Sequence, residues 1–556
     1  MLIALMRATR TFAAVGAAVA LVVAGALATP ASASPKRPTG ACASPLGSAP
    51  TRVGQIGGIV HPMVVHCAQP KIGLSDPAVG TPPLIDHGGP VMAVPSVGNK
   101  VVVTPIFWAP SGYSFTSGYK AVVLQYLHDV AAASGSHSNV FATNAEYSGS
   151  NGQISYGISV GTAVTDTTAY PTAGCTVNSG AIYADSSGYT TCLDDDQLVA
   201  ETGAVIAAGS LPTDLGHMYL MFTPKGVESC FYPGNPSNQQ CSINSTASAA
   251  FCAYHSYFGA GDASIYANMP FPIYSSATGY SCTDENLGGG IQAPNGDVDA
   301  DVEVSPLSHE MSEAITDPDL DAWYDSSGYE NGDECAYVYG PLSGSAGTQY
   351  NQVINSHNYL TQTEFSNADY AATGGGCLQS LPAVVPSVTS VSPRSGPTSG
   401  GTRVTVTGHG FTAAKSVTFG TKAATKFTVV TDKKITAVAP AHALGTVHIT
   451  ITNPDGTNTL GTTDRFTYKT PKPAVTKISP KSGSHLGGTL VTITGANFKR
   501  GATVLFGTAR GKHVLVKSAT KITVHAPRHS RGTVKVFVTT TGGKSAAKPS
   551  VRFRFS

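Results

Sequence analysis

The hydrophobic pattern of residues 85–380 predicts a domain that mixes strands and helices. Apolar runs at residues 101–108 and 217–223 have the length and composition of strands. Residues 119–133 and 197–208 instead carry apolar positions at helical spacing. Loops rich in Gly, Ser and Tyr separate these elements, and the segment is long enough to bury a core. We therefore expect an α+β domain.

A second pattern, short alternating strands separated by glycine turns, occurs twice at the C-terminal end. It covers residues 386–468 and 473–556, and Phe411 of the first copy recurs as Phe498, 87 residues later. Strands of this length and spacing predict one β-sandwich per repeat. The repeats resemble IPT/TIG immunoglobulin-like domains. In exported bacterial proteins, this resemblance implies spacer or binding modules rather than catalysts.

The N-terminal residues 1–33 have the features of a secretory signal peptide. Arg7 and Arg10 precede an apolar run at residues 12–28, and small residues at 31–33 form a cleavage site. The apolar run is too short and too rich in Ala and Gly to span a bilayer, and no later segment offers about 18 uninterrupted apolar residues. We expect a secreted, extracellular protein without a transmembrane segment.

The composition of residues 34–84 and the cysteine content agree with export. Residues 34–84 are rich in Pro and Gly and predict an irregular leader or pro-segment. An even number of cysteines without a C-x-x-C pair predicts disulfides rather than a cysteine-zinc site. Pairing in sequence order is our expectation, although spacing alone does not determine connectivity. The cysteines are Cys42, Cys67, Cys175, Cys192, Cys230, Cys241, Cys252, Cys282, Cys335 and Cys377.

The charge is balanced over the whole chain, with 34 basic and 33 acidic residues, but it is unevenly distributed. From Lys469 onward the sequence contains 17 Lys or Arg residues and no acid. This basic module could contact a polyanion such as an anionic cell-wall polymer, or it could simply be a soluble surface. No Walker loop and no G-x-S-x-G motif occurs, so we expect neither nucleotide or specific nucleic-acid binding nor a serine hydrolase.

The strongest chemical signal is the segment from His309 to Glu313, which has the form H-E-x-x-E. The alternating residues 297–304 predict a strand, and Ser305 with Pro306 predicts the start of a helix that Pro318 ends. Residues i and i+4 share one helix face. The motif therefore indicates a metallohydrolase helix, although a solvated helix face can carry the same residues.

In this interpretation His309 and Glu313 bind a metal ion, with zinc as the expected cofactor, and Glu310 is the general base. A third protein ligand would complete a catalytic site, and we favour Glu330. Asp333 is then a residue that orients His309, or the alternative ligand, since it follows Glu313 after nineteen intervening residues, the spacing of thermolysin-like enzymes. Asp319, at the place of a metzincin ligand, is a further candidate.

An ordered series of motifs over residues 85–380 resembles the phosphate-induced protein (EXORDIUM-like) family of secreted plant proteins and their bacterial relatives. The resemblance implies a cell-wall context and a zincin-like helix, without establishing catalysis. His255 and His357 are isolated histidines to which we assign no role. The matching motifs include Ala293-Pro294-Asn295-Gly296-Asp297, the H-E-x-x-E segment, Ala322-Trp323-Tyr324 and Glu330-x-Gly332-Asp333-x-Cys335.

The sequence therefore predicts an α+β zincin-like domain followed by two all-β immunoglobulin-like sandwiches. The expected function is metal-dependent hydrolysis of a peptide or protein substrate, as in a zinc metallopeptidase. The alternative is a non-catalytic, cell-wall-associated or adhesive protein in which any metal is structural.

Overall fold

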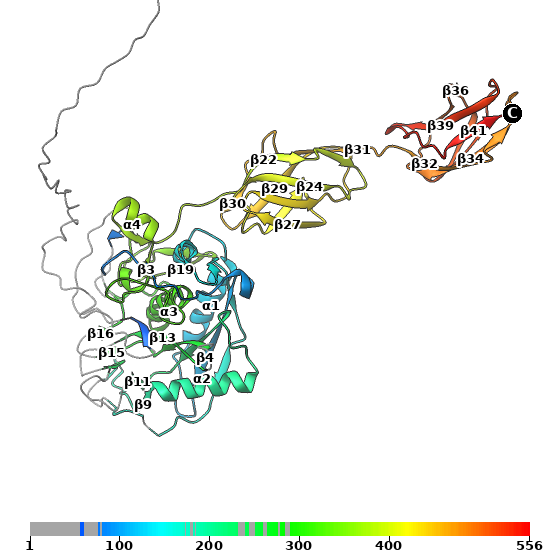
Figure 1. Cartoon of the computed structure of the whole chain (residues 1–556). Helices are drawn as coiled ribbons and strands as arrows, with labels where there is room; N and C mark the ends of the chain where they lie inside the picture. The colour runs from blue at the N-terminus through cyan, green and yellow to red at the C-terminus, as the bar shows by residue number, and fades with distance from the viewer. Residues whose placement is uncertain are drawn as a thin grey trace, which may run out of the picture. The chain divides into compact units, whose positions relative to one another are not determined.

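The structure is a computed structural model, shown in Figure 1, and its described residues all lie within the unit Cys42–Ser556. The predicted signal peptide, Cys42 and Cys67 lie outside the described residues. The described ranges are 56–60, 76–77, 80–172, 174–177, 182–183, 185–231, 240–243, 251–259, 264–275, 279–283 and 290–556.

A mixed β-sheet forms the centre of the first domain, with strand order β1-β13-β14-β10-β4-β7. The strands from β14 to β7 are parallel, whereas β13 and β1 are antiparallel to their neighbours. The predicted strand at residues 101–108 is confirmed as β4, and the one at 217–223 ends one residue earlier. The bounds are β1 Ile56–Val60, β4 Val101–Trp108, β7 Ile158–Val160, β8 Val164–Asp166 beside β4, β10 His217–Phe222, β13 Ala253–Phe258 and β14 Ser264–Met269.

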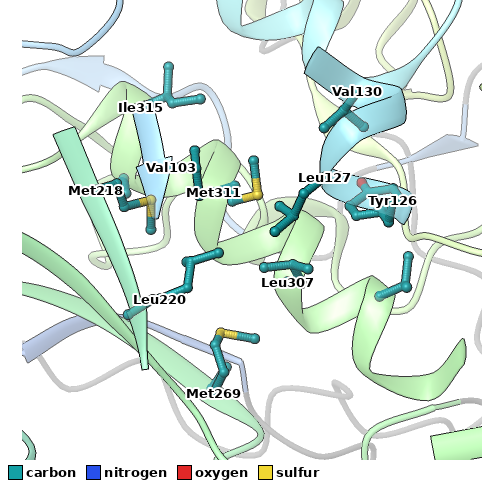
Figure 2. Close-up of a cluster of buried hydrophobic side chains, with 14 of the residues drawn as sticks. Val103, Tyr126, Leu127, Val130, Met218, Leu220, Met269, Leu307, Met311 and Ile315 are labelled. Carbon is teal, nitrogen blue, oxygen red and sulfur yellow. The ribbon is translucent and has the colours of Figure 1, made fainter. Parts of the chain in front are cut away.

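Helices cover both faces of this sheet, because its strands are apolar on both sides. In β10, Met218 and Leu220 belong to the larger buried cluster with α1 (Tyr119–Ala132) and α3 (Val298–Thr316), as Figure 2 shows. The next residues along the strand, Tyr219 and Met221, face the second cluster, to which α2 (Asp195–Gly209) contributes. Both predicted helices are confirmed, and the fold of this domain is mixed α/β.

Helix α3 begins about two turns before the predicted position. Residues 297–304, which we expected to form a strand, are the N-cap and first turns of this helix, and Pro306 lies inside it. The Asp297 carboxylate accepts a hydrogen bond from the Ala300 N–H at 3.0 Å and so caps the helix. Every residue from 300 to 316 is buried, so the alternation of acidic and apolar residues does not separate an exposed face from a buried one.

Shorter elements surround the sheet and connect the helices. The remaining elements are β2 Asp76–Pro77, β3 Ile85–Asp86, η1 Pro95–Val97, η2 Val140–Glu146, β5 Ser148–Gly149, β6 Gly152–Gln153, β9 Thr191–Asp194, β11 Val227–Phe231, β12 Gln240–Cys241, β15 Tyr274–Ser275, β16 Gly279–Tyr280, β17 Trp323–Tyr324, η3 Asp333–Cys335, β18 Gln352–Ile354, β19 His357–Tyr359, β20 Glu364–Phe365, α4 Asn367–Thr373 and β21 Gly376–Leu378.

Among the described residues, four disulfides stabilise this domain, and they confirm pairing in sequence order for the eight cysteines involved. Two of them lie side by side, since the sulfurs of Cys192 and Cys230 are 3.5 Å apart. The bridges are Cys175–Cys192, Cys230–Cys241, Cys252–Cys282 and Cys335–Cys377.

The two C-terminal repeats are β-sandwiches, each with its own buried core. Each packs a four-stranded sheet against a second, larger sheet, with the same strand order in both copies. The first contains β22 Ser387–Ser392, β23 Ser395–Pro397, β24 Arg403–His409, β25 Ser416–Phe419, β26 Lys422–Ala423, β27 Lys426–Thr431, β28 Lys434–Val438, β29 Gly445–Asn453, β30 Gly456–Thr457 and β31 Arg465–Lys469. The second contains β32 Ala474–Ser479, β33 Ser482–Gly483, β34 Leu490–Ala496, β35 Thr503–Phe506, β36 Ala509–Arg510, β37 Lys512–Ser518, β38 Lys521–His525, β39 Gly532–Thr540, β40 Gly543–Lys544 and β41 Arg552–Phe555.

Candidate metal centre

Helix α3 carries His309, Glu310 and Glu313 on the side away from the apolar contacts of Leu307 and Met311, and all three are fully buried. The Nε2 atom of His309 lies 2.9 Å from Oε1 of Glu313. Neither ring nitrogen of His309 has a partner in hydrogen-bond geometry among the described residues. A short approach without an aligned hydrogen bond is compatible with two ligands of one cation.

The loop that ends in η3 brings Asp333 to the same place. The Asp333 N–H donates a hydrogen bond to Oε1 of Glu313 at 2.9 Å, and Asp333 Oδ1 lies 3.7 Å from Nε2 of His309. Potential ligand atoms of these three residues lie within 4.8 Å of one another. The structure thus gathers the alternative third ligand, Asp333, with the two residues of the helix.

Glu330, our favoured third ligand, is also fully buried but occupies a different position. Its backbone N–H donates to Oδ2 of Asp333 at 3.3 Å. Among the described residues, Glu330 and Asp319 belong to none of the groups whose ligand atoms approach one another closely enough to share an ion. Sequence spacing alone could not decide between Glu330 and Asp333, because it does not show which of the two carboxylates the loop directs toward His309.

Gly332 fits closely against the ring of His309. A Cβ at this position would lie 2.8 Å from Cγ and Nδ1 of His309 and 3.0 Å from Oε1 of Glu313. The carbonyl of Gly332 also accepts a hydrogen bond from Nε2 of Gln362 at 2.7 Å, which holds the loop in place. Glycine is therefore required here for the close approach of the backbone to the site.

We expect the substitution Gly332→Ala to lower metal affinity at least tenfold, because the new methyl group displaces the His309 ring or the loop. The matched control is Gly203→Ala in α2, where the nearest atom to a new Cβ is an ordinary 3.6 Å away. Titration of both variants with Zn²⁺ by calorimetry provides the measurement. Equal affinities would show that the loop does not position His309.

His255, to which the sequence assigned no role, is part of the site. It lies in β13, fully buried, with Nδ1 3.2 Å from Oε2 of Glu310 and 3.8 Å from Oε2 of Glu313. Its Nε2 lies 3.2 Å from the carbonyl oxygen of Asp317, which can only accept a hydrogen bond. The proton on Nε2 is therefore held by the carbonyl, and Nδ1 faces the two carboxylates.

Glu364 in β20 adds a further buried acid, which the sequence analysis did not identify. Both of its carboxylate oxygens lack a hydrogen-bond partner among the described residues. Burial, followed by the charges of Glu313 and Asp333, raises the pKa of Glu364 well above its usual value. Burial also acts to raise the pKa of Glu313, but His309, His255 and the Asp333 N–H outweigh it and lower that pKa.

These groups fit a divalent cation. Buried carboxylates without balancing Lys or Arg are costly, and a cation removes that cost. One imidazole with two carboxylates suits zinc, and a ligand set this rich in oxygen also suits a harder ion such as Mn²⁺. Two other groups of potential ligand atoms among the described residues contain cysteines. These cysteines are joined in disulfides, so they are excluded as metal ligands.

The centre is closed in the structure, because each of its candidate ligands is fully buried. A surface cavity of about 500 Å³ lies elsewhere in the domain, at the start of α1. Its lining includes Tyr113, Phe115 and Lys120 and none of the candidate ligands. A substrate of the buried centre would need some part of the chain to move.

The comparisons with known proteins match three regions of the chain. Residues 190–371 match the Phosphate-induced protein 1 conserved region, and residues 386–468 and 473–555 match the IPT/TIG domain. The two predicted repeats are thus IPT/TIG domains, and all the residues of the candidate metal centre lie in the Phosphate-induced protein 1 region. The disulfides and the IPT/TIG domains fit an extracellular protein. Over the described part of the chain, no helix has the length and apolar character needed to cross a membrane.

Two curated relatives illustrate these matches. Protein EXORDIUM-like 3 of Arabidopsis thaliana is 35% identical over 75 residues, which cover 13% of this chain and 22% of that protein. Fibrocystin-L of Homo sapiens is 28% identical over 174 residues, which cover 31% of this chain and 4% of that protein. The chain therefore spans only a small part of the length of the relatives it matches.

Solved structures are similar over a comparable share of the chain. The extracellular region of Plexin A4 is 20% identical, covers 31% of this chain and 18% of its own, and has a TM-score of 0.17. Surface glycan-binding protein PbSGBP-B from Prevotella bryantii is 18% identical, covers 30% of this chain and 42% of its own, and has a TM-score of 0.20. Scores this low carry no argument about function.

Proposed function

We propose that the first domain of this protein is a secreted, zincin-like metal-dependent hydrolase that cleaves peptide bonds. His309, Glu313 and Asp333 hold the cation. The observation that carries this proposal is the 2.9 Å approach of His309 to Glu313 without hydrogen-bond geometry, in a fully buried cluster with Asp333. A bound Zn²⁺ would polarise a substrate carbonyl and lower the pKa of a bound water.

The protein supplies a proton acceptor beside the ligands. Glu310 directly follows His309 on the helix, and its Oε2 faces Nδ1 of His255 at 3.2 Å. In the proposed reaction, Glu310 takes the proton from the attacking water. His255 would orient this carboxylate as an imidazolium, which carries a proton on each ring nitrogen and so donates from Nδ1 as well as from Nε2. The carbonyl of Asp317 in turn fixes the ring of His255.

We expect Glu310→Gln to retain the metal and to lose roughly 10²- to 10⁴-fold of casein hydrolysis, the usual contribution of a general base. The matched control is Glu201→Gln on α2, outside the centre, which should leave the rate unchanged. Cleavage by the wild-type chain should disappear with a chelator and return with Zn²⁺. If Glu310→Gln cleaves casein at the wild-type rate, or the wild type does not cleave at all, the non-catalytic, wall-associated alternative replaces this proposal.

A second candidate function, binding of a polyanion, rests on the surface of the second IPT/TIG domain. All 15 Lys and Arg residues of residues 473–556 are exposed. Lys535 and Arg552 are direct cross-strand neighbours in β39 and β41. The equivalent pair in the first IPT/TIG domain is His448 and Arg465. There, Oδ1 of the adjacent Asp464 lies 2.7 Å from Nδ1 of His448. Two positive charges that face each other without a nearby acid repel each other. A bound anionic partner would neutralise this repulsion, so the surface favours such a partner.

We propose that this partner is an anionic cell-wall polymer. Residues 473–556 should bind anionic wall material at low salt and release it as salt rises, because the Debye length falls to about 8 Å at physiological ionic strength. Residues 386–468 form the matched control, since that module has its own core and contains acids. Equal retention of the two modules, or retention that half-molar salt does not change, would make the charge a solubility feature only.

A further inference from the structure

Part of the predicted leader is built into the sheet beside the metal centre. Strand β1 (Ile56–Val60) pairs antiparallel with β13, and Gly57 lies directly opposite His255. Among the described residues, β1 is the terminal strand of the sheet on this side. The same strand also lies against α3 and η3. β1 thus touches the three elements that carry His255, His309 and Asp333.

Three further contacts hold the end of the leader beside the same loop. Asp76 of β2 pairs with Cys377, whose disulfide partner Cys335 closely follows Asp333 in η3. Gly80 fits so tightly that a Cβ there would lie 2.5 Å from Oε2 of Glu334, and the next residue, Thr81, donates its N–H to Oδ2 of Asp325 at 3.0 Å. The leader therefore contacts both flanks of the centre.

We infer that strand β1 is an internal inhibitor that closes the metal centre and occupies the sheet edge at which an extended polypeptide substrate binds. This inference rests on the proposed function, which it extends by naming the substrate conformation and the means of control. The candidate ligands are fully buried while β1 is in place. Removal of β1 turns β13 into an edge strand with His255 in its middle.

The chemistry of that edge selects the substrate. An edge strand presents a row of backbone N–H and C=O groups, and an extended peptide pairs with them by strand addition. A peptide held along β13 in place of β1 would place its own backbone amides next to the elements that carry the centre, as β1 now does. A glycan has no such regular ladder of amides, so the geometry favours an unfolded or extended polypeptide.

The test uses the full chain, treated with a chelator so that binding does not depend on metal. Successive residues of a regularly paired strand direct their N–H groups to opposite edges. Ile56 and Gly57 lie opposite Ser256 and His255, before the irregularity between Gly57 and Val60, so only one of these two residues can donate to β13. Proline removes the N–H and is tolerated on an edge strand where that N–H faces solvent. The single variants Ile56→Pro and Gly57→Pro are therefore matched controls for each other, and the double variant Ile56→Ala with Gly57→Ala retains both donors.

The probe is a fluorescent peptide with the sequence of residues 54–62, and fluorescence anisotropy measures its binding. We expect one proline variant to bind the peptide at least tenfold more tightly than the wild type, the alanine variant and the other proline variant. Hydrogen exchange of the amides of residues 253–258 should rise in the same variant only. Near-ultraviolet circular dichroism confirms that all chains are folded. The inference is overturned if neither proline variant binds the peptide, and also if both variants bind it equally well. If the chain gives the expected peptide binding but binds no metal, the proposed hydrolase function is contradicted and the role of β1 as a covering strand is not.

Discussion

Replacing Glu313 with alanine is expected to reduce bound metal from one equivalent to well below one per chain. Glu313 belongs to the group of potential ligands with His309 and Asp333 and also to a second group with His255 and Glu310. Its Oε1 faces His309 and its Oε2 faces His255. Loss of a charged donor from a three-ligand site removes more affinity than the roughly 10- to 100-fold typical of a supporting residue. The measurement is elemental analysis after dialysis.

The control for this prediction is Glu201→Ala, which removes an acid from α2 and leaves the centre intact. Near-ultraviolet circular dichroism should show that both variants retain their tertiary structure, so that loss of metal is separated from loss of fold. Undiminished metal in folded Glu313→Ala would remove Glu313 from the site.

The second large effect distinguishes the two candidates for the third ligand. Asp333→Ala should abolish measurable binding of Zn²⁺, because Asp333 is within reach of His309 and Glu313. Glu330→Ala should weaken Zn²⁺ binding by no more than roughly 10- to 100-fold, as expected for a residue that orients a ligand without binding the metal itself. Competition with a chromophoric chelator gives both affinities. The reverse order would return the ligand role to Glu330.

Local periodicity predicted the parts of the fold that depend on local sequence. The strand at residues 101–108 has the predicted bounds, and the 87-residue repeat gave two sandwiches, because both signals lie in the order of apolar residues and turns. The predicted start of α3 was wrong because residues 300–304 are all buried, on every side of the helix. In such a segment, period-2 alternation no longer distinguishes a strand from a helix.

The candidate site was predictable only where its residues are neighbours on one element. His309, Glu310 and Glu313 follow from helix geometry. His255 joins them through the packing of β13 against α3, a long-range contact that no spacing rule contains. The choice of Asp333 over Glu330 depends on the turn at Gly332, which directs the Asp333 N–H toward Glu313. Glu364 approaches from a strand whose sequence gives no indication of burial.

The most direct test of the account is the metal content of the full wild-type chain. The purified protein, reconstituted with Zn²⁺ or Mn²⁺ and dialysed, should retain one equivalent of divalent cation, and His309→Ala should retain none. A folded wild-type chain with its disulfides intact that retains neither ion would contradict the existence of the metal centre.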